Sequence, residues 1–168
     1  MAIQRQLDTP NCHVVGVDSS AAMLERARAL HGDEARIEWV HADVRDVPIE
    51  SACAVVMNYT LQFVPSADRL PLLVRIRQAL DPSGVVIVSE KVQFSDAWEQ
   101  SYFDHTHVGY KRANGYSALE VAQKRTALEN VLIPDRIEEH EARFRAAGFG
   151  RVHVWFRCLN WVSFVAML

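Results

Sequence analysis

The sequence predicts an α/β fold built on a doubly wound, mostly parallel sheet, and three observations support this prediction. Short apolar runs rich in Val and Ile alternate with amphipathic segments along most of the chain. One of these runs, Gly84–Lys91 (GVVIVSEK), is apolar on both faces, as expected of a parallel strand covered from two sides. The last two runs lie close enough in sequence to form an antiparallel hairpin. Alternating strands and helices with right-handed crossovers give a doubly wound sheet.

The element boundaries follow from the apolar spacing and from cap and turn residues. Strands are predicted at His13–Asp18, Ile37–Asp43, Cys53–Thr60, Gly84–Lys91, Val152–Arg157 and Trp161–Leu168. Helices are predicted at Ser20–His31, Ser66–Leu80, Phe94–His107, Ser117–Asn130 and Asp135–Ala147, with a turn at Lys111–Ser117. Ser66 is the expected cap of its helix, which ends near Pro82 and Gly84, and Gly148 closes the last helix. No repeat or linker interrupts the pattern, so we predict one domain over residues 1–168.

Composition excludes several classes of function. The chain has 168 residues, 49% of them apolar, and a net charge of −3, so bulk charge favours neither direct nucleic-acid binding nor an anionic membrane. No apolar run is long enough to span a bilayer, and residues 1–11 lack the apolar segment of a signal peptide. The three cysteines have no metal-ligand spacing, which predicts free buried thiols in a reducing cytoplasm.

Polar residues end three successive predicted strands. Asp18 ends the first, Asp43 the second, and Asn58 lies near the end of the third. Ligands of open α/β sheets bind at this carboxyl edge. An acidic side chain there can accept both hydroxyls of a ribose, and Asp43 with the backbone N–H of Val44 can read an adenine edge. Asn58 can donate to and accept from an amino-acid group.

A structural role competes with this interpretation. A lone Asp at a strand end is often a cap or turn former, and Asp18 directly before Ser19 and Ser20 fits that role as well. The ordered trio favours a nucleotide-type ligand but does not separate S-adenosylmethionine from NAD. A glycine-rich turn would separate them, and the two candidate glycines, Gly16 and Gly84, are isolated.

Other polar groups carry weaker signals. His105 and His107 lie two residues apart without a third ligand nearby, so no metal site is expected. Ser89 and Ser95 have no His/Asp partners that would form a hydrolase triad. The run Glu138–Arg145 (EEHEARFR) is expected to be the solvated face of a helix, and Arg75 and Arg77 are likewise expected on the surface.

One segment is more specific than any of these patterns. Lys111–Leu132 (KRANGYSALEVAQKRTALENVL) resembles the signature of the carboxy-S-adenosylmethionine synthases. The resemblance extends from about Asn11 to the C-terminus through VDSSAAMLERAR (17–28), ADVRDVPIE (42–50), MNYTLQFV (57–64), SEKVQF (89–94) and AGFGRVHVWFRCLN (147–160). The hairpin after the Gly-Phe helix end is similar to the class I methyltransferase variant of the Rossmann-like sheet.

The resemblance implies a function and a set of site residues. It implies transfer of a carboxyl group from prephenate to S-adenosyl-L-methionine, which gives carboxy-S-adenosyl-L-methionine for modification of a tRNA wobble uridine. It also implies a homodimer that needs no metal. The positions that match the family's binding residues are Asp18, Ser19, Asp43, Val44, Asn58 and Arg125. Arg125 is the expected catalytic residue, since a carboxylate on the sulfonium methyl calls for a planar, bidentate cation. Without the resemblance, Arg125 is one surface charge on an amphipathic helix.

The sequence also departs from the family pattern. We expect the chain to begin near the end of the helix that follows the family's first strand and glycine-rich loop, and therefore to lack both. The gap in the sheet is expected between His13–Asp18 and Cys53–Thr60, with weaker cofactor binding as a consequence. The alternatives that remain are an ordinary methyltransferase and a non-catalytic chain that acts through association with another chain.

Overall fold

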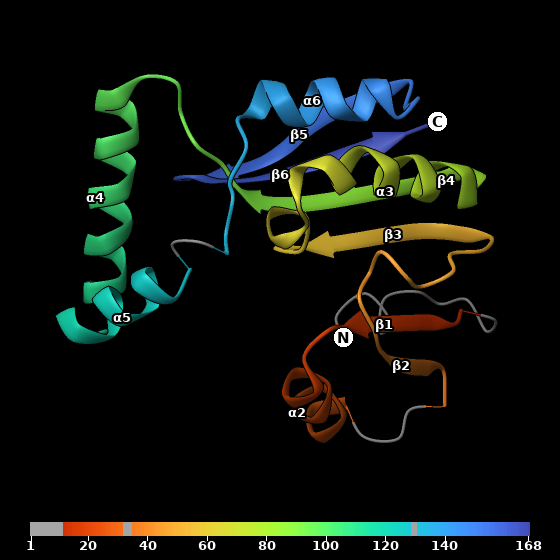
Figure 1. Ribbon diagram of the computed structural model, residues 1–168, viewed down its shortest axis with the longest axis horizontal. Coiled ribbons are helices and arrows are strands. Elements are labelled where there is room, and N and C mark those ends of the chain that lie inside the picture. Colours follow the sequence, from red (N-terminus) through yellow and green to blue (C-terminus); the bar gives the residue numbers. More distant parts are fainter. Residues whose placement is uncertain (1–11, 32–34, 129–130) are drawn as a thin grey trace. The chain divides into compact units, whose positions relative to one another are not determined.

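The computed structural model describes residues 12–31, 35–128 and 131–168, which separate into two compact units. The first unit, Met1–Pro48, contains β1 (Val14–Asp18), α2 (Ala21–His31) and β2 (Ile37–His41). The second unit, Ile49–Leu168, contains all later elements (Figure 1). Each unit is described by itself. The expectation of one domain over residues 1–168 remains a prediction, because compactness alone does not establish independent folding.

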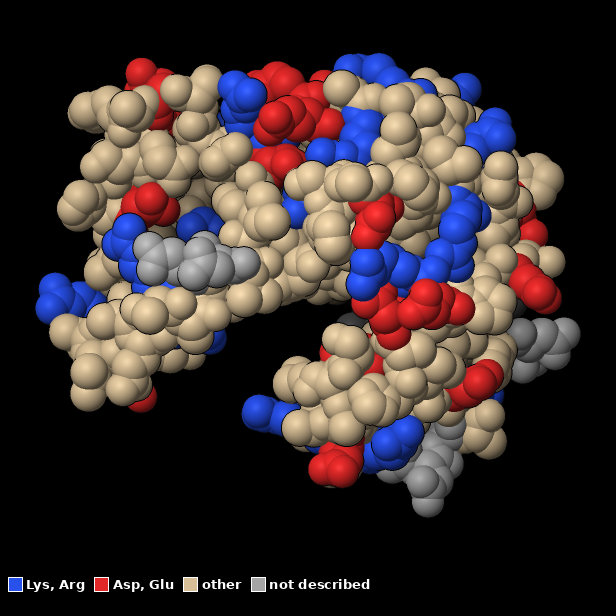
Figure 2. Space-filling view, in the orientation of Figure 1, with Lys and Arg blue, Asp and Glu red and all other residues tan. Residues whose placement is uncertain are grey.

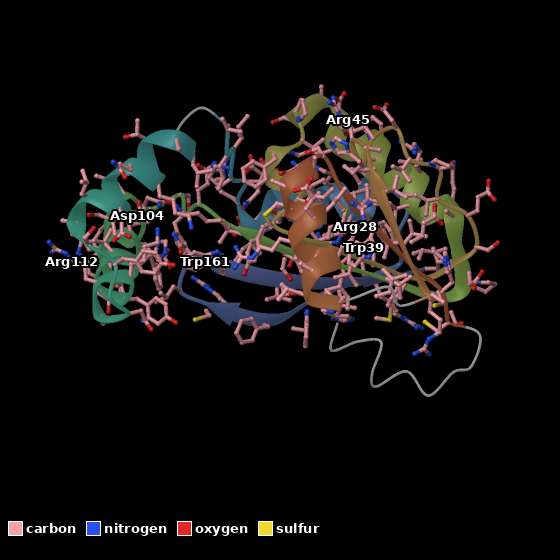
Figure 3. The ribbon with its side chains drawn as sticks, turned by 90° about the horizontal axis from the view of Figure 1, so that it is seen from below. Arg28, Trp39, Arg45, Asp104, Arg112 and Trp161 are labelled. Atoms are coloured by element: carbon pink, nitrogen blue, oxygen red, sulfur yellow. The ribbon has the colours of Figure 1, made fainter. Side chains whose placement is uncertain are left out.

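The first unit is a parallel strand pair with one helix. β1 and β2 pair in register from Val14 with Ile37 to Asp18 with His41. Gly16 faces Trp39, and a Cβ atom at position 16 would lie 2.6 Å from the indole ring, so only glycine leaves room for it. The Arg28 guanidinium, on α2, donates to the Trp39 carbonyl at 3.4 Å and ties the helix to β2 (Figure 3).

The second unit is a four-stranded mixed sheet. Its strands are β3 (Ala52–Asn58), β4 (Leu80–Lys91), β5 (Arg151–Cys158) and β6 (Trp161–Met167), in the order β3-β4-β6-β5. β3 and β4 are parallel, whereas β6 is antiparallel to both of its neighbours. Its other elements are the short 3-10 helix η1 (Leu61–Phe63) and the helices α3 (Ser66–Ala79), α4 (Ala97–Ala113), α5 (Ala118–Leu128) and α6 (Ile137–Ala146).

Two helices cover one face of this sheet and form its core. α3 and α6 lie side by side along the sheet, whereas α4 and α5 extend away from it (Figure 1). Alternate residues of β4 point towards α3 and α6, so Val86 and Val88 are fully buried while their neighbours are not. Phe164 of β6 packs against Phe144 of α6, with the ring centroids 5.9 Å apart.

A charged cluster is buried beside that core. The Arg69 side chain of α3 is fully buried and pairs with Asp135, which also accepts from Arg143 Nη2 at 2.6 Å. Arg69 donates in addition to the carbonyls of Val64 and Ile133, each at 2.9 Å. Burial raises the pKa of Asp135, but hydrogen bonds and charge from the two guanidinium groups outweigh this effect and hold it below its usual range. The cluster fixes α3, α6 and the segment before α6 to one another.

The structure confirms the predicted fold class. Every predicted strand is present within two residues of its expected start and end, except that β4 begins earlier, at Leu80. β1 and β3 belong to different sheets. The helix end expected at about residues 1–6 and the predicted helix end at Asn130 lie outside the described residues.

Several local predictions were wrong. Pro65, not Ser66, caps α3, and no side chain bonds there, because Ser66 is already the first helical residue. Lys111–Ala113 belong to α4, and the turn begins at Asn114, whose N–H bonds back to the helix. The cysteines are free but not buried: Cys53, near the start of β3, and Cys158, at the end of β5, are exposed, and Cys12 is half-buried.

The charged run of α6 is not simply a solvated face. His140 and Phe144 within it are buried at 2% and 0% exposure, and Arg143 pairs with Asp135. Burial lowers the pKa of His140 to about 4, so the imidazole is neutral in the folded protein at neutral pH. Arg77, expected on the surface, is exposed but donates from Nε to the Gly148 carbonyl at 3.2 Å. Among the described helices, none is long and apolar enough to cross a membrane.

Candidate functional site

The first unit brings four predicted site residues to one sheet edge. Asp18 and Ser19 follow β1, and Asp43 and Val44 follow β2, the strand paired with it. The Ala42 N–H donates to the Asp18 carbonyl at 3.2 Å, which extends the pairing up to the residue before Asp43. Because the strands are parallel, both carboxylates lie at their carboxyl ends, where ligands of α/β sheets bind.

Asp18 has a structural role that does not exclude a binding role. Its Oδ1 accepts the Ser20 N–H at 2.8 Å directly before α2 begins, as the turn-forming interpretation predicts. A carboxylate has about four acceptor positions, so one hydrogen bond leaves capacity for a ligand hydroxyl. The Ser19 carbonyl lies 3.0 Å from His41 Nε2, which fixes the turn against the end of β2.

Asp43 is held by a neighbouring arginine. Both of its oxygens accept from the Arg45 guanidinium, at 3.0 and 2.8 Å, and Oδ1 also accepts the Arg45 N–H at 2.9 Å (Figure 3 labels Arg45). These hydrogen bonds lower the pKa of Asp43 to about 2. The Asp43 side chain is 37% exposed, so this fixed, ionised carboxylate remains accessible to solvent. The half-buried Val44 follows it with its backbone N–H in the next position.

In the second unit, Asn58 occupies the end of β3. It is the register partner of Ser89 in β4, and the N–H of the next residue, Tyr59, donates to the Ser89 carbonyl at 2.7 Å. Tyr59 has a φ of 55°, a left-handed conformation that is uncommon for an aromatic residue. The chain therefore turns sharply after Asn58, and the exposed Asn58 side chain stays at the sheet edge.

A buried carboxylate that sequence reasoning missed holds this turn. Glu90 of β4 has 0% exposure and accepts three backbone N–H groups: Oε1 from Thr60 at 3.1 Å and from Leu61 at 2.8 Å, and Oε2 from Gln62 at 3.1 Å. Burial raises the pKa of Glu90 to about 7, against the opposing effect of these three donors. The sequence indicates the burial of Glu90 only through its position in an apolar strand, because alternation places residue 90 on the core face.

Replacing this carboxylate should loosen the turn that carries Asn58. In Glu90→Gln the carboxamide keeps one acceptor oxygen but directs an NH₂ group towards an N–H that has lost its acceptor. A buried donor without a partner costs about 1–3 kcal/mol, so we expect a loss of that size in the unfolding free energy measured with urea. Hydrogen exchange of the Leu61 and Gln62 amides should accelerate together with it.

The exposed Glu38→Gln is the matched control for this change and should alter stability by about 0.5 kcal/mol or less. The pH dependence supplies a second check. The folded state of the wild type binds the Glu90 proton more tightly than the unfolded state does, so stability should fall as the pH rises from about 4.5 to 7. Equal protection of both amides in Glu90→Gln and in the wild type would contradict the role assigned to Glu90.

An aromatic pocket of about 200 Å³ lies beside Tyr59. Its walls come from the turn after β3 and from β4, β5 and β6, chiefly Tyr59, Ser89, Trp155, Phe156, Trp161 and Ser163. The Ser89 and Ser163 hydroxyl oxygens are 2.8 Å apart, and Trp155 Nε1 donates to Ser163 Oγ at 2.7 Å. The lining thus combines a hydrogen-bonded polar network with aromatic rings, an arrangement that suits a flat organic ring with polar substituents.

Arg125 lies in the last turn of α5, and its side chain is exposed. Its guanidinium has no ion-pair or hydrogen-bond partner among the residues that the structure describes. An exposed guanidinium is available for a bidentate contact with a carboxylate. The placement agrees equally with the surface role that the helix pattern alone suggests, so the binding role of Arg125 remains a proposal.

Metal-binding groups do not form a site in the described part of the chain, where no three His, Cys, Asp or Glu side chains converge. His105 and His107 both lie on α4 rather than on a strand. His105 Nδ1 lies 2.8 Å from the Ser101 carbonyl, and the His107 ring packs edge-on against Trp161, with centroids 4.2 Å apart.

Comparisons with known proteins define the class first. Residues 1–84 match the family model described as a methyltransferase domain. The O-methyltransferase family 2 protein of Planctomyces limnophilus has a TM-score of 0.66 at 16% identity, and human N-acetylserotonin methyltransferase in complex with SAM has 0.60 at 15%. These alignments cover 98% and 94% of this chain but only 44% and 41% of those chains, so they support the fold alone. The fold is that of the class I S-adenosylmethionine-dependent methyltransferases.

Sequence relatives identify the family within that class. The carboxy-S-adenosyl-L-methionine synthases of Pseudomonas aeruginosa and Pseudomonas putida are 48% and 46% identical to this chain. Each alignment covers 99% of this chain and 70% of the relative. The chain belongs to the carboxy-S-adenosyl-L-methionine synthase family and is an S-adenosylmethionine-dependent enzyme by that membership. The family resemblance and the fold expected from the sequence are confirmed.

Proposed function

We propose that this protein transfers the ring carboxyl group of prephenate to the methyl carbon of S-adenosyl-L-methionine. The observation that carries the proposal is the 46–48% identity to carboxy-S-adenosyl-L-methionine synthases over 99% of the chain. In the balanced reaction, prephenate loses its ring carboxyl and ring hydroxyl and becomes phenylpyruvate. The methyl carbon gains the carboxyl group and loses one proton, which leaves with the hydroxyl as water.

The residues at the strand ends fit the parts of the nucleoside cofactor. Asp18 and Ser19 are proposed for the ribose hydroxyls, and Asp43 with the Val44 N–H for the adenine edge. The ionised, arginine-held carboxylate of Asp43 supports this assignment, since a fixed acceptor reads a donor pattern without reorganisation. Asn58, on a turn held by Glu90, is proposed for the amino-acid end of the cofactor. These residues bind and orient the cofactor.

Arg125 is proposed to recognise the new carboxylate of the product. A guanidinium binds a carboxylate through two parallel N–H donors, and this geometry stabilises the carboxylated cofactor over the methylated one. An ordinary methyltransferase needs no cation at that position, so Arg125 is the residue that separates the two functions. No metal is part of the proposal.

The proposal extends to partners and biological role. The carboxylated cofactor would serve the modification of a tRNA wobble uridine in the cytoplasm, without direct binding of tRNA by this chain. A homodimer is supported by the surface of α4 and α5, neither of which buries any described residue. Trp98, Tyr110 and Leu119 of these helices are 72%, 61% and 67% exposed, a large aromatic and apolar surface for a protein in water.

The test separates carboxyl transfer from methyl transfer by its products. The chain is incubated with prephenate and either S-adenosylmethionine or S-adenosylhomocysteine, which lacks the methyl group, and phenylpyruvate is measured by chromatography. Phenylpyruvate above the non-enzymatic background should form only with S-adenosylmethionine. Conversion of S-adenosylmethionine into S-adenosylhomocysteine, with prephenate unchanged, would contradict the proposal and favour an ordinary methyltransferase.

A further inference from the structure

Three lysines converge on one side of α4, next to the aromatic pocket. Asp104, His107 and Lys111 are spaced three and four residues apart on α4 and therefore share one helix face. Lys91 Nζ lies 3.7 Å from Asp104 Oδ1, which brings the end of β4 to that face. Lys124 of α5 completes the group, since its charge acts on both His107 and Lys111. Lys and Arg side chains appear as separate patches over α4 and α5 in Figure 2.

The group carries more positive charge than it can neutralise itself. Asp104 is its carboxylate, and it already accepts from Gln100 Nε2 at 2.9 Å and from Asn160 Nδ2 at 3.4 Å. Partial burial and the neighbouring lysines lower the pKa of Lys111. Burial and the same charges lower the pKa of His107 to about 4, so the imidazole is neutral at physiological pH. The attraction for an anion comes from the three ammonium groups, whose charge one carboxylate cannot balance.

Strand register connects this group to the aromatic pocket. Lys91 is the register partner of Trp161, and Ser89 is the partner of Ser163 two residues earlier in the same ladder. Because side chains alternate along a strand, Ser89 and Lys91 point to the same face, opposite to the buried Glu90. Trp161 lines the pocket and also packs edge-on against His107, so one indole separates the pocket from the lysines (Asp104 and Trp161 in Figure 3).

We propose that Lys91, Lys111 and Lys124 around His107 form an anion subsite that holds a carboxylate of the carboxyl donor, with the ring of the donor in the aromatic pocket across Trp161. The inference rests on the proposed carboxyl transfer and names the residues that select its donor. A cyclic dicarboxylate fits both parts: the ring stacks on aromatic walls, and the carboxylate meets ammonium groups and an imidazole N–H. These residues position the donor and take no part in bond making.

The test compares binding of two probes by calorimetry: prephenate and malonate, a dicarboxylate without a ring. The double variant Lys111→Gln/Lys124→Gln should weaken prephenate binding roughly tenfold, since each exposed charge pair contributes a modest part of the affinity. Malonate should bind at least about tenfold more weakly than prephenate, since it cannot bury a ring. The pKa of His107, followed by NMR of its ring protons, should rise when prephenate binds, because an anion stabilises the imidazolium.

Arg151→Gln is the matched control. Arg151 is an exposed cation at the first residue of β5. Arg151 and Val85 both pair with Met167 of β6, so Arg151 lies roughly 20 Å along the strand direction from Lys91. This variant should leave prephenate affinity within about twofold of the wild type. Equal losses in both variants, or an unchanged pKa of His107 on saturation with prephenate, would overturn the anion subsite. Malonate binding as tight as prephenate would overturn the role of the pocket.

The inference and the proposed function can fail separately. If carboxy-S-adenosylmethionine forms while the double variant binds prephenate like the wild type, the function stands and the anion subsite is wrong. If prephenate binding depends on the lysines but no carboxylated cofactor forms, the subsite stands and the proposed reaction is wrong.

Discussion

Asp135→Ala should lower the unfolding free energy of the protein by about 3–5 kcal/mol, since it removes the acceptor shared by two arginines. The Arg69 side chain has 0% exposure and Arg143 has 14%, so neither charge can recover its loss from water without a local rearrangement. Arg69 would keep its contacts to backbone carbonyls, which are dipoles and not counter-ions. The guanidinium charges of Arg69 and Arg143 would then lack a counter-ion and should destabilise the junction of α3 and α6.

Glu141→Gln is the matched control for this change. Glu141 also pairs with an arginine, Arg145, at 3.1 Å, but the Arg145 side chain is 63% exposed. An exposed pair of this kind contributes about 0–1 kcal/mol, so urea unfolding should separate the two variants clearly. Similar small losses in both variants would show that the cluster around Asp135 is solvated in solution and does not stabilise the core.

The Asp135 cluster also shows where sequence reasoning fails. The sequence pattern predicts Asp135 at the start of a helix and the charged residues after it on a solvated face, because polarity is the usual indicator of exposure. The structure buries Arg69, Asp135 and His140. Arg69 and Asp135 pair across 66 residues of sequence, and no local pattern encodes such a pairing. For the same reason the role of Glu90 could not be predicted, since its three N–H donors lie 28 to 30 residues before it.

The strand ends, in contrast, could be predicted. Asp18, Asp43 and Asn58 follow apolar runs whose length and alternation are visible in the sequence, and the structure places each at or just after the end of a strand. What the sequence could not supply was the surroundings of each group. Nothing local indicates that Arg45 fixes Asp43 or that Tyr59 turns in a left-handed conformation after Asn58.

Arg125→Ala should abolish the preference for the carboxylated cofactor and leave binding of S-adenosylmethionine nearly unchanged. Only the carboxylated form presents an anion at the sulfonium methyl. A hydrogen bond to a charged group contributes about 1.5–3 kcal/mol, which corresponds to roughly a tenfold to hundredfold loss in relative affinity. Calorimetric titration with carboxy-S-adenosylmethionine and with S-adenosylmethionine measures both affinities directly.

Two further variants make that experiment specific. Arg125→Lys should recover only part of the preference, because an ammonium group cannot make the paired contact. Arg112→Ala removes a comparable exposed cation, from the last turn of α4 instead of α5, and should retain the full preference. If Arg112→Ala and Arg125→Ala lose this preference equally, general surface charge and not a bidentate contact sets the affinity for the carboxylated cofactor. Arg125 then has only a surface role.

The central claim is that the carboxyl group of the donor ends on the methyl carbon of the cofactor. Prephenate labelled with ¹³C in its ring carboxyl group, incubated with the chain and S-adenosylmethionine in unlabelled bicarbonate buffer, tests this directly by mass spectrometry. The account predicts carboxy-S-adenosylmethionine that carries one ¹³C per molecule, with phenylpyruvate in equal amount. Unlabelled carboxy-S-adenosylmethionine, or labelled carbon dioxide with no carboxylated cofactor, would contradict it.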